Sequence, residues 1–150
     1  MLRTSAPLIG ALDVMKIDPD LYEDVLSLAE SLVAANEQDY DSLYAKLRQL
    51  CAKANGSLKP HPFFYETLAD FTLDDQVAID IYLEALQVAD TFRLNEYQAS
   101  IQLAIAYRYQ DLGDHASAFN YATGAKELAK SVGDKTLTKE IKNFLKSAKK

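Results

Sequence analysis

Apolar residues recur at helical spacing through most of the chain, and this pattern is what most constrains its fold. Leu21, Val25, Leu28 and Leu32 are separated by four, three and four residues, which places them on one face of a helix. No segment alternates with a period of two for long enough to predict a strand. The 150 residues include only five glycines and four prolines, too few for a turn-rich sandwich or barrel. The pattern therefore predicts a single all-α domain over residues 1–150.

Local signals divide the pattern into seven helices. Asp18 and Pro19 predict the first start, because Asp caps free amides and Pro suits the first helical turn. Glycines at 56, 113 and 133 predict helix ends, because glycine tolerates a positive φ. Residues 1–18 are predicted to form an N-terminal arm or a short extra helix, and residues 57–62 a linker. The expected helices are 19–35, about 40–56, 63–71, one from Asp74 or Asp75 through Val88, 95–112, 115–131 and 137–148.

Charge is distributed unevenly along the chain. The segment Lys126–Lys150 has eight lysines and three acids, a net charge of 8 − 3 = +5, so the other residues carry −6 − 5 = −11. An acidic body attracts a basic partner and repels nucleic acid. The basic segment lacks the interleaved aromatic residues that stack on bases, so no nucleic-acid partner is predicted. The alternative is that both charged regions are solvated faces that keep the protein soluble.

Two features bear on location. The uncharged stretch Thr4–Leu12 is too short to span a bilayer and lacks a clear cleavage site, so no membrane association or leader is predicted. Cys51 is the single cysteine, and it cannot form an internal disulfide. A cytoplasmic protein with a buried packing thiol at position 51 is therefore expected.

Small residues recur after acidic ones in two segments. In each segment an acid precedes three residues that are spaced by four and then three positions, and the two sets are Asp114, Ala118, Ala122 and Ala125, and Asp75, Ala78, Tyr82 and Ala85. Residues 74–133, and the string LGDHASAF above all, resemble the tetratricopeptide repeat family, although Gln102 replaces its tryptophan and Lys130 its proline. The resemblance implies about three stacked antiparallel hairpins, with residues 137–150 as a capping helix. A generic helical bundle is the alternative.

The same resemblance implies a binding surface. In tetratricopeptide folds the first helix of each pair lines a concave groove. The matching positions here are Phe63, Thr67, Asp70, Phe71, Ser100, Leu103, Tyr107, Gln110 and Asp111. An aromatic groove with acidic edges suits a partner protein or peptide that carries Lys or Arg. The alternative is that several of these aromatic side chains belong to the core, and for Tyr107 both assignments stay open.

Catalytic and metal-binding patterns are absent from the sequence. The two histidines, His61 and His115, lie in unrelated contexts, and there is no HxxxH, CxxC, GxSxG or glycine-rich phosphate loop. His61, between two prolines, is expected to be an exposed linker residue, and His115 a structural residue beside a turn. The sequence therefore predicts no enzyme, no metal and no cofactor.

Three functions remain open at this point. The first is an adaptor that binds a partner protein or peptide through the acidic, aromatic face. The second is a dedicated neutraliser or escort of one basic client, such as a toxin immunity protein or a secretion chaperone. The third is a helical-bundle enzyme or small-ligand binder. A second copy of the chain is also a candidate partner, because an uncovered terminal hairpin can stack on another molecule.

Overall fold

The computed structural model describes residues 17–56 and 60–148, and over these ranges it is entirely helical, with no strand. The predicted all-α fold is thereby confirmed. Each helix begins or ends close to the position that the sequence predicts. The seven helices are α2 (Pro19–Ala34), α3 (Glu37–Asn55), α4 (Pro62–Asp70), α5 (Asp75–Thr91), α6 (Asn95–Asp111), α7 (His115–Val132) and α8 (Lys135–Ala148).

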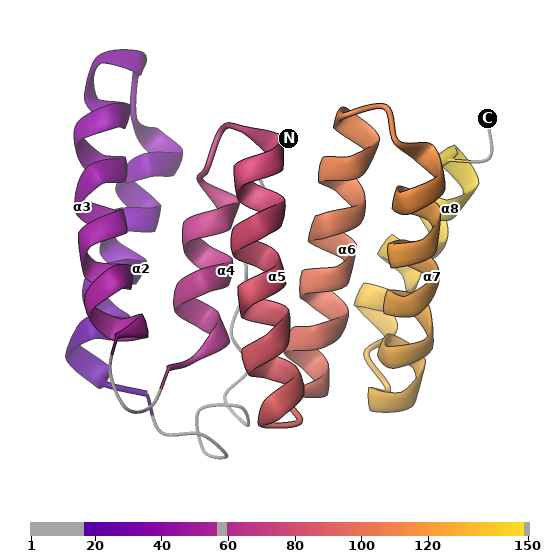
Figure 1. Cartoon of the computed structure of the whole chain (residues 1–150). Coiled ribbons are helices and arrows are strands. Elements are labelled where there is room, and N and C mark those ends of the chain that lie inside the picture. The colour runs from indigo at the N-terminus through magenta and orange to yellow at the C-terminus, as the bar shows by residue number, and fades with distance from the viewer. Residues whose placement is uncertain (1–16, 57–59, 149–150) are drawn as a thin grey trace.

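The helices stand side by side in a row that begins with α2 and α3 and ends with α7 and α8 (Figure 1). Each helix packs against the next one in sequence, and α4 also contacts α2 and α6. The last helix, α8, packs against α7 and α6. The pair α2 and α3 therefore forms one end of the row, and the pair α7 and α8 forms the other. The interpretation of this row as tetratricopeptide-like repeats stays a prediction from the sequence.

Capping explains where the helices start and stop. The Asp18 carboxylate accepts hydrogen bonds from the amides of Asp20 (2.9 Å) and Leu21 (3.2 Å), as the first start signal predicts. Gly113 and Gly133 have φ values of 82° and 74°, the left-handed conformation that ends a helix at little cost only for glycine. The last helix starts two residues earlier than predicted. The reason is that the Asp134 carboxylate accepts from the amide of Leu137 at 2.9 Å and so caps it.

The core has two parts. One lies among α2 to α6 and includes Leu47, Phe63 and Ile79, and the other lies among α6, α7 and α8. In the second part the predicted repeat positions of α7 are fully buried, which lets α6 and α7 approach closely; these are Ala118, Ala122 and Ala125, and Ala129 one turn further on is buried as well. Cys51 is buried in the first part, as predicted, and burial raises the pKa of its thiol to about 12.

The segment around His61 differs from its prediction as an exposed linker. His61 is 0% exposed and caps α4, since its Nδ1 accepts a hydrogen bond of 3.1 Å from the amide of Phe63. Its ring packs edge-on against that of Tyr97, with 5.2 Å between centroids. His115, in contrast, is an exposed first residue of α7. The predictions for the arm before Ile17 and for linker residues 57–59 concern positions outside the described ranges.

Candidate functional site

The structure separates the nine residues of the predicted binding surface into two groups. Ser100, Tyr107 and Gln110 are half-buried on α6, and Asp111 is exposed at its end. The other five are buried, and the expectation that they line an open groove is corrected; these are Phe63, Thr67, Asp70, Phe71 and Leu103. The accessible part of the predicted surface is therefore confined to one face of α6.

The burial of α4 explains this correction. The helix lies among α2, α3, α5 and α6, so neighbouring helices surround it. The ring of Phe63 packs against that of Tyr22 in α2 at 4.8 Å, and the carbonyl of Phe71 accepts a hydrogen bond of 2.5 Å from the Tyr40 hydroxyl in α3. Leu103 packs into the second core part beside α7. Helix α4, which the resemblance places at the groove, is thus an inner helix covered by its neighbours.

A buried polar network connects α4, α5 and α6. Arg108 of α6 is 5% exposed, and its Nη1 lies 3.1 Å from Oδ1 of Asp75. Its Nη2 donates to the carbonyls of Ala69 (3.0 Å) and Asp70 (3.3 Å) at the end of α4. One guanidinium therefore caps the C-terminal carbonyls of α4 and pairs with the first residue of α5.

Two further hydrogen bonds complete this network. The Ser100 hydroxyl donates to Oε2 of Glu66 at 3.0 Å, and the Tyr82 hydroxyl donates to Oδ1 of Asp70. Burial, and next the Asp70 carboxylate, raise the pKa of Tyr82 well above its usual range, which keeps this phenol protonated as a donor. These contacts fix α6 against α4 and α5, so the accessible face of α6 has a rigid support.

On its other side the α6 face continues onto α8. The ring of Tyr107 packs edge-on against Phe144 with 4.9 Å between centroids, and its hydroxyl donates to Glu140 at 3.3 Å. Both contacts hold the half-buried ring in one orientation. We name the surface formed by Ser100, Tyr107, Gln110, Asp111 and Glu140 the α6 face. It presents an aromatic ring between polar side chains and two carboxylates.

Sequence reasoning missed the residues that support this face. Glu66 and Arg108 were not singled out, and Tyr82 was named only as a repeat position, because their partners lie between 12 and 39 positions away along the chain. No periodic pattern reports pairings at such distances. The one available signal was the placement of charged residues inside α4 and α6, where buried charge requires a partner.

Three further observations concern metal sites, membrane-spanning helices and similarity to known proteins. Over residues 17–56 and 60–148, no group of three or more His, Cys, Asp or Glu side chains is arranged to hold a metal ion. Within the same residues, no helix is both long and apolar enough to cross a membrane. In comparisons with known proteins, no family model, curated protein or solved structure matches the chain.

Proposed function

We propose that this chain is a non-enzymatic module that binds a partner protein or peptide through the α6 face. The carrying observation is the position of Tyr107, a half-buried ring held by Phe144 and Glu140 beside the exposed Asp111. An oriented aromatic side chain with carboxylates next to it suits a basic side chain with an apolar stem. A cytoplasmic site of action belongs to the same proposal.

The rigid support of the α6 face favours a role in binding a partner over the alternative that this face is only a solvated surface. A side chain that is already ordered loses little conformational entropy when a partner binds, and this improves affinity. Hydrogen bonds of Ser100, Arg108 and Tyr107 connect α6 to α4, α5 and α8, respectively. The partner favoured by Asp111 and Glu140 carries Lys or Arg, in agreement with the acidic charge of residues 1–125.

Affinity capture from a lysate of the source cells tests the proposal. Immobilised full-length chain is compared with Tyr107→Ala and Asp111→Lys, and retained proteins are quantified by mass spectrometry at low and high salt. Asp90→Lys is the matched control, because Asp90 is exposed near the end of α5 and is not one of the residues of the α6 face. Tyr107→Phe retains the ring and reports whether loss of the hydroxyl alone matters.

We expect specific proteins to be retained by the wild type and by Asp90→Lys, and lost with Tyr107→Ala and Asp111→Lys. Retention that all four variants share would contradict the assignment of the α6 face. One stoichiometric protein that survives high salt would favour the alternative of a dedicated neutraliser or escort. Several partners lost with salt would favour an electrostatically steered adaptor.

A further inference from the structure

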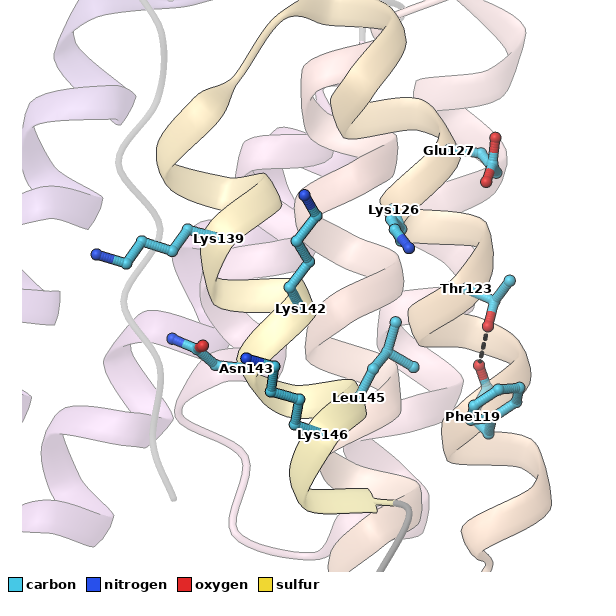
Figure 2. A pocket seen from close by; sticks show the side chains of 9 residues that line it. All are labelled: Phe119, Thr123, Lys126, Glu127, Lys139, Lys142, Asn143, Leu145 and Lys146. Carbon is cyan, nitrogen blue, oxygen red and sulfur yellow. Dashed lines mark hydrogen bonds between the residues drawn. The ribbon is translucent and has the colours of Figure 1, made fainter.

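A basic groove runs along the last two helices. It consists of two adjoining hollows of about 570 and 470 Å³ that share Lys139 and Lys142. Figure 2 shows one of them, with side chains from α8 on one side and Phe119, Thr123 and Glu127 of α7 on the other. The two hollows are lined by Lys126, Lys130, Lys135, Lys139, Lys142 and Lys146, with Glu127 as the one carboxylate among the lining residues.

The groove lies at the end of the row, where the described helices leave one side of α8 uncovered. Helix α8 contacts α7 and α6, and no described helix follows it in the row. The groove is also partly apolar, since Phe119 is 41% exposed and Leu145 is half-buried in its wall. An added helix with acidic residues would therefore fit there as the next member of the row.

The opposite end of the row carries such a helix. Helix α2 presents Asp20, Glu23, Asp24 and Glu30 to solvent and contains no Lys or Arg. Glu23 and Glu30 are seven residues apart, as are Lys139 and Lys146, so both pairs span about 10.5 Å along a helix. Val33 on α2 is 64% exposed and offers an apolar contact to match Phe119.

We propose that the groove on α7 and α8 binds helix α2 of a second copy of this chain, head to tail. The complementary charges and the equal spacing of the two charged pairs carry this assignment. A nucleic acid is the less favoured occupant, because the residues outside Lys126–Lys150 carry a net charge of −11, which repels a polyanion. The contact is heterologous, so it builds a ring or an open chain of subunits. It uses no residue of the α6 face.

Sedimentation velocity of the full chain tests this proposal through charge reversal. One variant combines Lys139→Glu and Lys146→Glu, and another combines Glu23→Lys and Glu30→Lys. The control combines Lys46→Glu and Lys53→Glu, which reverses two exposed lysines of α3 with the same seven-residue spacing and the same change in net charge as the groove variant. Circular dichroism of each variant establishes that it is folded.

At low salt and about 0.1 mM chain, a range where weak self-association is measurable, we expect the wild type and the control to form oligomers. Each groove or α2 variant alone is expected to associate about tenfold more weakly, because like charges then meet at the contact. An equimolar mixture of the two variants restores oligomers, since each supplies the charge that the other lost. High salt weakens all of these oligomers.

Three results would overturn the proposal. The first is a wild type that sediments as a monomer at low salt. The second is self-association that both reversals leave unchanged, or a mixture of the two variants that stays monomeric. The third is a wild-type monomer whose groove lysines bind a labelled DNA oligonucleotide, which would assign the groove to a polyanion.

Discussion

The guanidinium of Arg108 lies 3.1 Å from the carboxylate of Asp75 and donates to the last carbonyls of α4, so one side chain of α6 joins three helices. Helix α4 has no basic residue in its own last turn. The positive charge that favours a helix C-terminus therefore comes from a residue 38 positions further along the chain. This contact places the α6 face relative to the rest of the row.

Arg108→Met is expected to lower the free energy of unfolding by about 3 kcal/mol, because it leaves buried carbonyls and Asp75 without their partner. Arg108→Lys restores the charge but not the planar fork that reaches both groups, and it should recover only part of the loss. Urea titration monitored by circular dichroism measures both. Arg48→Met, at an exposed position of α3, is the control and should cost under about 0.5 kcal/mol.

His61 should make stability depend on pH. Burial lowers its pKa to about 4 from 6.5, so the unfolded chain binds a proton more readily between these values. Stability is therefore full above pH 6.5 and falls as the pH drops toward 4. The loss is at most about 3 to 4 kcal/mol, since the two pKa values differ by about 2.5 and each pKa unit is worth about 1.4 kcal/mol. Urea titrations at pH 7, 6, 5 and 4.5 measure it.

His61→Asn separates this effect from the titration of carboxylates. Asn retains an oxygen that can cap α4 but carries no titrating group. As the pH falls from 6.5 to 4.5, the free energy of unfolding of the wild type should decrease steadily relative to that of this variant. A difference that is constant with pH would contradict a buried neutral His61.

Cys51 is expected to be inert in the folded protein, because it is fully buried and burial raises its pKa to about 12. A thiol reagent such as DTNB should react with one thiol per chain in denaturant and with almost none in buffer at pH 8. Ser27→Cys adds an exposed thiol on α2 as an internal control and should react at once. Prompt labelling of wild-type Cys51 in buffer would show that this core part opens readily.

Substitution of two residues with positive φ should change the stability of the fold differently: Gly133→Ala should lower it, and Arg93→Gly should not. Gly133 has φ of 74° with open space around it, so Gly133→Ala costs about 1 kcal/mol through backbone strain alone. Arg93 is a non-glycine residue at φ of 55°, and Arg93→Gly should leave stability equal or higher. Thermal unfolding of both variants measures the pair. A destabilised Arg93→Gly variant together with an unaffected Gly133→Ala variant would contradict these backbone assignments.

Much of the fold could be predicted because its signals are local. Asp18 caps a helix through amides two and three residues away, and Gly113 and Gly133 end helices through their own φ. The small residues of α7 predicted close packing for the same reason, since their spacing alone places them on one face. The bounds of each helix followed from these signals to within about three residues.

The candidate site was harder to predict because its determinants are not local. The resemblance places Phe63 and Leu103 in a groove, yet both side chains are buried in the core between helices. His61 appeared to be a linker residue between two prolines, but its ring packs against Tyr97, 36 positions away. The buried residues of α6 lie on most faces of this helix. Periodicity alone could therefore not separate its core positions from its accessible ones.

The account depends most on the α6 face as the contact with a partner, and photo-crosslinking tests this most directly. Tyr107→p-benzoylphenylalanine places the reactive group on the face, and Phe92→p-benzoylphenylalanine places it at an exposed aromatic position after α5. Both proteins are irradiated in lysate of the source cells, and adducts are identified by mass spectrometry. The account predicts a discrete protein adduct from position 107 that position 92 does not form. No adduct at 107, or the same adducts at both positions, would contradict it.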